Sequence, residues 1–292
     1  MTTVGAVFLP QNPPERLRPV AEAADEAGLA ELWLWEDCFW ESGIAAASAA
    51  LAWTERVRVG IGLLPVPLRN VALAAMEIAT MHRLFPDRAI VAVGHGVQSW
   101  MGQAGARVRS PVTLLREHLD ALHALLRGEN VTKDGRYVRL DGVRLVWPPA
   151  TPSRVLAGAT GPRSIRLSGS AADGTLLTSS TTPDGVRAAR ALIDEGRAAA
   201  GRTDPHPITV YLLATTGPGA RERLAAEAVR QGWDADLDVG AAGSAEEVAA
   251  VVRRYAQAGA DTVVLEPTRE EPDPVGFVRF AANQVAPLVR DT

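Results

Sequence analysis

The stretch "VLAGATGPRSIRLSGSAADGTL" (residues 155–176) holds one structural unit of this chain, from one strand to the next. An apolar run predicts a strand over 155–158, and the small residues after it predict a turn. Pro162 suits the first position of a helix over 162–172, because the missing N–H of proline costs nothing there. A second strand is expected over 174–178. A strand followed by a helix that returns to a further strand is typical of parallel α/β folds.

The same alternation runs through all 292 residues and predicts a (β/α)8 TIM barrel. The alternative is a doubly wound sheet, but its Gly-rich fingerprint is missing after the first strand. Gly94-His95-Gly96 resembles half of that fingerprint, and position 99 is Ser. Strands are expected over 4–9, 31–35, 57–62, 88–93, 155–158, 174–178, 208–214 and 262–265, and helices over 15–27, 44–53, 71–84, 111–127, 162–172, 183–201, 219–232, 245–258 and 274–289.

Residues 129–148 interrupt this rhythm, because they alternate polar and apolar side chains and carry two Asp-Gly pairs. Such a pattern predicts a hairpin, here inserted between units four and five. We expect a single barrel domain over residues 1–292, with the insertion at about 129–148.

The composition and net charge of the chain limit the classes of binding partner that are expected. The formal net charge of −4 gives no electrostatic support for binding nucleic acid. Cys38 is the single cysteine, so an internal disulfide is excluded and a reducing cytoplasm fits. No signal peptide is visible, and no apolar stretch of membrane-spanning length is free of charge. We expect a cytoplasmic protein with a small-molecule partner and neither a nucleic-acid nor a membrane partner.

The turn after the strand at 155–158 is a candidate anion site. In a barrel, functional groups gather at the C-terminal ends of the strands. The start of a helix offers free N–H groups and its positive end. Arg163 in the first turn is unfavourable for the helix alone, but it would help to hold a phosphate. The alternative interpretation is an ordinary turn with an exposed arginine.

Four segments, in order, resemble the luciferase-like flavin and deazaflavin (F420)-dependent oxidoreductases, which are (β/α)8 barrels. They are "GLAELWLWED" (28–37), "TERVRVGIGLLPVPLRNVALAAMEIATM" (54–81), "DRAIVAVGHG" (87–96) and the opening stretch (155–176). The resemblance spans about residues 4–290 and implies F420 as the cofactor, with FMN as the alternative.

The resemblance also implies roles for individual residues. A cis peptide bond between Gly62 and Leu63 would press against the back of the deazaflavin ring, although Gly62 could instead be a plain turn glycine. His95 would lie near the polar edge of the cofactor. Asp173 is expected to be structural, with its carboxylate bonding backbone near a strand start. The phosphate-binding turn would comprise Gly158, Ala159, Thr160, Gly161, Pro162 and Arg163.

Two departures from the family pattern concern the acid–base residues. The family's Asp-His pair after the second strand is Glu36-Asp37 here, and Val97 stands where sugar-phosphate-oxidising members have an acid. Oxidation of glucose 6-phosphate is therefore not expected. The candidate catalytic residues are Glu36, Asp37 and His95. A carboxylate desolvated by neighbouring aromatic rings would have a raised pKa and could act as a general acid, whereas a solvated one would be a plain loop residue.

Tryptophans near the predicted mouth suggest what the substrate is like. Trp35 ends the second predicted strand, and Trp40 and Trp100 lie in the loops after the second and fourth strands, where the three could line an apolar pocket. We expect an apolar or planar organic substrate. The family resemblance also favours a homodimer through the Ala-rich helices at 44–53 and 71–81, which could equally just pack on the barrel.

Other barrel chemistries find little support. Lys133, the only lysine, lies in the insertion, which excludes a Schiff-base site at a strand end. The five histidines are scattered, so we expect no metal site. Three functions stay open: an F420-dependent oxidoreductase, a reduced-FMN-dependent two-component monooxygenase, and a non-catalytic flavin-binding barrel.

Overall fold

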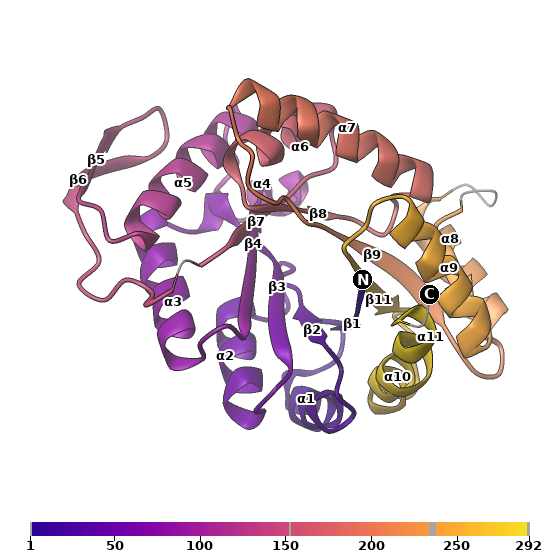
Figure 1. Cartoon of the computed structure of the whole chain (residues 1–292). Coiled ribbons are helices and arrows are strands. Elements are labelled where there is room, and N and C mark those ends of the chain that lie inside the picture. The colour runs from indigo at the N-terminus through magenta and orange to yellow at the C-terminus, as the bar shows by residue number, and fades with distance from the viewer. Residues whose placement is uncertain (1, 152, 234–237, 291–292) are drawn as a thin grey trace.

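Eight parallel strands close into a barrel, as the sequence predicts (Figure 1). The computed structural model describes residues 2–151, 153–233 and 238–290. The sheet closes because β8 pairs with β9 and β11 pairs with β1. Around the barrel the order is β1 (Thr3–Phe8), β2 (Glu31–Leu34), β3 (Arg58–Pro65), β4 (Ala89–Gly94), β7 (Val155–Gly158), β8 (Gly174–Leu177), β9 (Ile208–Thr215) and β11 (Thr262–Pro267).

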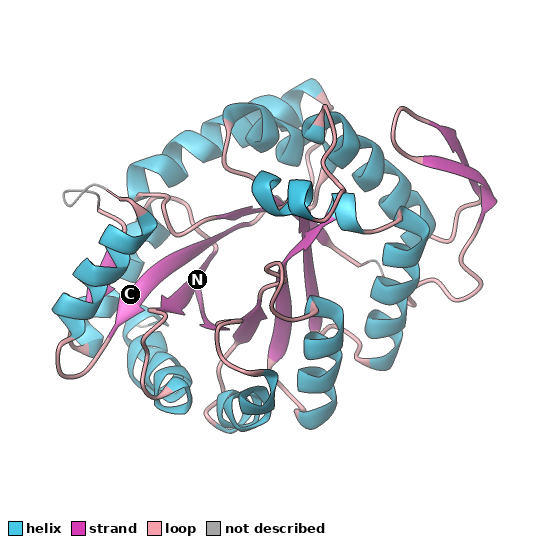
Figure 2. Cartoon of the chain, turned by 180° about the vertical axis from the view of Figure 1, so that it is seen from behind, coloured by secondary structure: helices cyan, strands magenta, loops and turns pink. Residues whose placement is uncertain are grey.

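Helices surround the strands (Figures 1 and 2). Their apolar faces pack inwards: in α1, Leu17, Val20, Ala21 and Ala24 are buried at the spacing of one helix face. The larger core cluster of the described residues lies between the helices and the outer face of the sheet. The helices are α1 (Leu17–Glu26), α2 (Gly43–Trp53), α3 (Val71–Leu84), α5 (Pro111–Leu126), α6 (Pro162–Ala171), α7 (Pro183–Ala199), α8 (Ala220–Gln231), α9 (Ala245–Gln257), α10 (Pro274–Phe280) and α11 (Ala286–Arg290).

The insertion is a hairpin of β5 (Val131–Asp134) and β6 (Arg139–Val143), which projects beside α5 (Figure 1). It forms its own antiparallel sheet, apart from the barrel. The carboxylate of Glu117 on α5 accepts three backbone N–H groups from residues 136–138 and ties the hairpin to the helix layer. The predicted insertion between units four and five is confirmed.

The structure differs from the sequence prediction in three places. The loop after β4 contains a short helix, α4 (Gln98–Gln103), and β10 (Gly240–Ala242) adds to the end of β9 outside the closed ring. The last helix, expected as one element over 274–289, is divided by a wider π turn over Ala281–Val285. That turn keeps Val285 and Val289 buried against the barrel. No helix in the described part of the chain is both long and apolar enough to cross a membrane.

Side chains fill the inside of the barrel. Trp33 is completely buried there, and a Cβ on Gly60 would lie 2.5 Å from its ring, so that position requires glycine. Towards the N-terminal end, Glu31 accepts a hydrogen bond from the Trp33 indole and pairs with Arg58. The interior cluster comprises Val7, Leu9, Trp33, Ala92, Leu156, Leu176, Tyr211 and Val264. Because this filling closes the lower barrel, a ligand has room only at the C-terminal end.

Candidate active site at the C-terminal end of the barrel

A bulge at the end of β3 forms one wall of the mouth. The register between β3 and β4 shifts between Ile61 and Leu64, and the Gly62–Leu63 peptide bond is cis, as the resemblance implies. The Tyr211 hydroxyl, from β9 across the barrel, donates to the Gly62 carbonyl oxygen at 3.2 Å. A Cβ on Gly62 would collide with that hydroxyl, so only glycine fits there.

The Leu63 side chain lies across the ends of the next two strands. A Cβ on Gly94 would lie 2.6 Å from Leu63 Cδ2, and a Cβ on Gly158 would collide with the same atom. Gly158, predicted as part of the phosphate-binding turn, therefore also has a packing role. Together these residues make a small apolar shelf at the mouth.

The start of α6 is open to an anion. Gly161 is its N-cap and provides no side-chain hydrogen bond, whereas Thr182 and Ser244 cap α7 and α9. Arg163 in the first turn is exposed and has no partner in the described part of the chain. The next residue, Ser164, is buried and bonds to His95 Nε2 at 2.8 Å. Free N–H groups and a cation thus meet at this turn, the arrangement that binds phosphate. Ala159 is buried and Thr160 is exposed.

His95 reaches this turn from the end of β4. Its half-buried ring is desolvated, which lowers its pKa although a backbone hydrogen bond at Pro111 acts in the opposite direction. The imidazole is therefore neutral near pH 7. A neutral ring bonded to Ser164 can orient the α6 turn and can also face a ligand at the β4 end.

The structure separates the two adjacent carboxylates of the predicted site. Glu36 forms a two-point ion pair with Arg69 and accepts the N–H of Gly43 at 2.8 Å, so it fixes the start of α2. The Asp37 carboxylate makes no hydrogen bond within the described residues, and burial raises its pKa to about 6. A group with that pKa can hold or release a proton near neutral pH.

The three predicted pocket tryptophans differ in their surroundings. Trp35 faces the interior and packs edge-on against Tyr211, with ring centroids 5.3 Å apart. Trp40 is 57% exposed on the loop after β2. Trp100 is half-buried on α4, beside the fully buried Met101. Trp35 is thus part of the floor, and the other two lie on the rim.

Sequence reasoning missed Glu266 on β11. Val264 belongs to the interior cluster, so Glu266, two residues later, also faces the barrel interior. It is 5% exposed, and burial is the main reason that its pKa rises to about 8, against a hydrogen bond with Ser179 that lowers it. The sequence could have indicated this residue, because in "TVVLEPT" (262–268) an acidic side chain stands two positions after a valine and therefore points to the same face of the strand.

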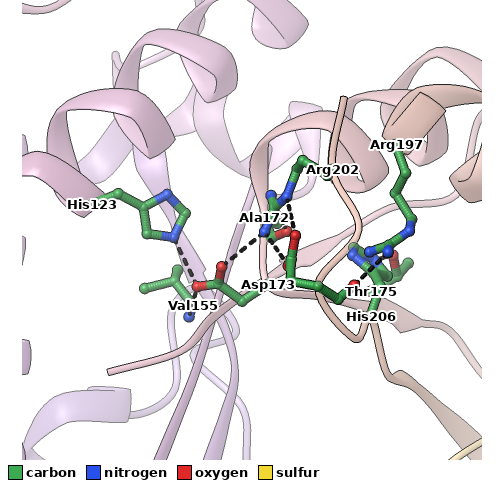
Figure 3. A network of polar contacts seen from close by, with 9 residues as sticks. His123, Val155, Ala172, Asp173, Thr175, Arg197, Arg202 and His206 are labelled. Atoms are coloured by element: carbon green, nitrogen blue, oxygen red, sulfur yellow. Dashed lines mark hydrogen bonds and ion pairs between the residues drawn. The ribbon is translucent and has the colours of Figure 1, made fainter. Parts of the chain in front are cut away.

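At the opposite end of the barrel, Asp173 is the centre of a polar network (Figure 3). It accepts from His123 Nε2 at 2.9 Å, the Val155 N–H at 3.0 Å and Arg202 at 3.2 Å. Burial alone would raise its pKa, but these bonds outweigh burial and lower it to about 2. The predicted structural role of Asp173 is confirmed. A cavity of about 640 Å³ beside this network, lined partly by Arg127 and Asp173, is remote from the predicted site.

Comparison with known proteins places these features in context. A family model described as luciferase-like monooxygenase matches residues 2–260. The 5,10-methylenetetrahydromethanopterin reductase of Methanolobus tindarius is 29% identical over 213 residues, which are 73% of this chain and 64% of that protein. The F420-dependent glucose-6-phosphate dehydrogenase of Nakamurella multipartita is 30% identical over 206 residues, which are 62% of this chain and 61% of that protein. The chain thus spans less than two thirds of the length of these relatives.

A solved structure has the same fold over its whole length. It is an F420-dependent secondary alcohol dehydrogenase in complex with an F420–acetone adduct. It superposes with a TM-score of 0.87 at 22% identity, and the match covers 99% of each chain.

Proposed function

The chain belongs to the luciferase-like monooxygenase family, and on this basis we propose that it is an F420-dependent oxidoreductase acting on an apolar or planar organic substrate. Two similar proteins, the dehydrogenases for glucose 6-phosphate and for secondary alcohols, carry F420 dependence in their names. When bound, the deazaflavin supplies or accepts the hydride. The protein contributes binding, orientation and electrostatics.

The observation that carries this proposal is the uncapped start of α6. Gly161 leaves the first-turn N–H groups free, and Arg163 adds an exposed cation beside them. A phosphate of the cofactor would accept from these groups. Leu63 and Gly62 at the β3 bulge would contact the ring, and His95 would lie at its polar edge, held by Ser164.

Asp37 is the residue we assign to proton transfer. Its pKa of about 6 allows both protonation states near neutral pH, and its carboxylate is not engaged by another side chain of the described residues. Glu36 is occupied by Arg69 and by the start of α2, which favours a structural role for it. Of the two carboxylates that stand in place of the family's Asp-His pair, only Asp37 is thus available.

The rim argues for a substrate without a sugar phosphate. Val97, which is 46% exposed, replaces an acid of the sugar-phosphate-oxidising pattern. Trp35 on the floor and Trp40 and Trp100 on the rim give flat apolar surfaces instead. Such surfaces suit an apolar or planar molecule.

We expect the enzyme to act in the cytoplasm as a homodimer, without a nucleic-acid partner. Apolar side chains on α2 and α3 support the dimer, since Trp53, Leu73 and Met76 are 38%, 48% and 58% exposed. Exposed apolar groups on adjacent helices are typical of an interface. Sedimentation velocity at micromolar concentration should show a species of twice the 30.9 kDa chain mass, and a monomer alone would contradict this expectation.

The proposed cofactor is tested by titrating the purified protein with oxidised F420 and with FMN, with cofactor fluorescence as the readout. Arg163→Ala should weaken F420 binding about tenfold, because one charge-assisted contact is lost. Arg166→Ala is the matched control, since Arg166 lies on the same helix but pairs with Glu195 at 2.6 Å. That control should bind F420 like the wild type.

The other outcomes of this titration point elsewhere. A preference for FMN would favour a reduced-FMN-dependent two-component monooxygenase. Binding of neither compound would leave a barrel without flavin chemistry. Equal losses in the two arginine variants would remove the anion-binding role of the α6 start.

A further inference from the structure

Several buried oxygen atoms of the described residues have no hydrogen-bond partner, and three of them lie at the ends of two neighbouring strands. These three are Gln11 Oε1, just beyond β1, and Glu266 Oε2 and Thr268 Oγ1, at the end of β11. β1 and β11 are paired neighbours in the sheet, so the three residues lie at one edge of the mouth. A buried polar atom without a partner costs about 1–3 kcal/mol. Oxygens of this kind, gathered at a barrel mouth, are typical of a ligand site.

The surroundings of Glu266 are negative. The charged groups that act on it within the described residues are two carboxylates, Glu227 on α8 and Asp37 beyond β2. Arg230 donates hydrogen bonds to both Glu227 and Glu270, so its positive charge is already paired with two carboxylates. Tyr211 on β9 and Ser179 beyond β8 also interact with Glu266, and both are uncharged. Glu266 therefore lies in a negative electrostatic potential, which would favour the binding of a cation.

We propose that Glu266 is a specificity-determining residue that binds a protonated nitrogen of the substrate, with Gln11 and Thr268 completing the site. The inference rests on the proposed function in that the substrate lies at the same mouth as the cofactor. An ammonium group has three N–H donors and no acceptor, which matches three oxygens without partners. A substrate carbonyl oxygen could accept one hydrogen bond from a neutral Glu266, but it would leave the Gln11 oxygen unpaired.

The position of this site fits a division of the mouth into two halves. In the strand order, β4 and β7 lie across the eight-stranded barrel from β11 and β1. The β4 and β7 half carries His95, Arg163 and the free N–H groups of α6, which suit an anion. The β11 and β1 half carries oxygens, which suit a cation. A negatively charged cofactor and a positively charged substrate would thus occupy opposite sides.

The test is calorimetric titration of the wild type with benzylamine and with benzyl alcohol, each with and without saturating oxidised F420. The two compounds have similar shapes and differ in charge, and the pH is set just above the pKa of Glu266. Benzylamine should bind at least tenfold tighter than benzyl alcohol. Glu266→Gln should remove this preference without changing the affinity for benzyl alcohol. Glu195→Gln is the matched control, because it makes the same charge change on the surface of α7.

A second variant keeps the test decisive if Glu266→Gln does not fold. Thr268→Val retains the shape of the side chain and removes one oxygen, and it should weaken benzylamine binding about threefold. Equal binding of the two compounds by the wild type, or unchanged benzylamine affinity in both variants, would overturn the proposal. Tighter binding of the neutral ketone acetophenone would instead assign Glu266 as a neutral donor and would also overturn it.

The same titrations separate this inference from the proposed function. If F420 binds and benzylamine shows no preference, the cation site is wrong and the cofactor proposal stands. If benzylamine binds with the expected preference and F420 does not bind, the cofactor proposal is wrong and the cation site stands.

Discussion

Asp173, just before β8, and Asp37, just beyond β2, are the same residue type at opposite ends of one barrel. Both are desolvated, and they differ in the hydrogen bonds and charges around the carboxylate. Asp173 is bonded by His123, Arg202 and the Val155 backbone, and its pKa falls to about 2 (Figure 3). Asp37 is half-buried without such bonds, and desolvation raises its pKa to about 6. The comparison teaches that a half-buried acid with hydrogen-bond partners stabilises the fold, whereas one without partners is kept for a ligand or a reaction.

The rest of each region follows this rule only in part, because His206 Nδ1 and Arg197 Nη1, near Asp173, are also buried without a partner. Around Asp173, Arg202 also donates to the Ala172 carbonyl oxygen at 2.6 Å, and His206 bonds to Thr175 at 2.8 Å. At the mouth, Glu266 and Thr268 each keep a buried oxygen without a partner. The stability of the barrel therefore comes partly from polar groups at the N-terminal end, while the C-terminal end gives up some stability for binding.

The largest expected effect is on catalysis at the mouth. Asp37→Asn should lower the rate of hydride transfer at least a hundredfold, because general acid–base groups contribute about 10²–10⁴. The measurement is turnover of F420 with a substrate found by screening organic compounds. Asp173→Asn, the matched control at the other end, should keep its turnover at a temperature where it is folded. Unchanged turnover in Asp37→Asn would contradict the assignment.

Asp37→Asn is also expected to raise the stability of the folded state at high pH. Because the folded-state pKa of Asp37 is about 6, above the ordinary value of 3.8, ionisation of this group opposes folding as pH rises through that range. The variant should therefore be more stable than the wild type at pH 8, by about 2 kcal/mol after allowance for solvent screening, and equally stable below pH 4.

The next largest expected effect is a loss of stability at the N-terminal end of the barrel, opposite in sign to the effect of Asp37→Asn. Asp173 has a folded-state pKa of about 2, below the ordinary 3.8, so its charge stabilises the folded state above pH 4. Asp173→Asn should lower the free energy of unfolding by about 2 kcal/mol at pH 7, and the difference should shrink as pH falls towards 2. Urea unfolding followed by circular dichroism at several pH values measures it. A stability loss that does not depend on pH would show that the charge of Asp173 is not what matters.

The fold could be predicted because its signals are local. Short apolar strands, turn glycines and amphipathic helices repeat along the chain, and each barrel strand lies within three residues of its expected bounds. The missed elements, α4 and β10, are short and have few apolar residues to mark them. The divided last helix was missed because both parts keep the same apolar face on the barrel.

The site could be predicted only in part, because its decisive contacts join distant residues. Glu36 and Asp37 are adjacent in sequence, and what separates their roles is Arg69, 33 positions after Glu36. The packing of Leu63 on Gly94 and Gly158 likewise joins three separate strands. Glu266 could have been found from its inward parity on an apolar strand, but its lack of partners is visible only in three dimensions.

The smallest expected effect compares two serines on the same helix. Ser164 Oγ bonds to His95 at the mouth, while Ser168 Oγ bonds to Thr175 at 2.6 Å and thereby joins the Asp173 side of the barrel. Ser164→Ala should weaken F420 binding about threefold with little change in thermal stability, because one neutral hydrogen bond contributes about 0.5–1.5 kcal/mol. Ser168→Ala should lower the thermal stability with little change in F420 binding. If Ser168→Ala weakened F420 binding as much as Ser164→Ala, the two ends of the helix would not be independent. The distinction between a binding end and a stabilising end would then fail along α6 itself.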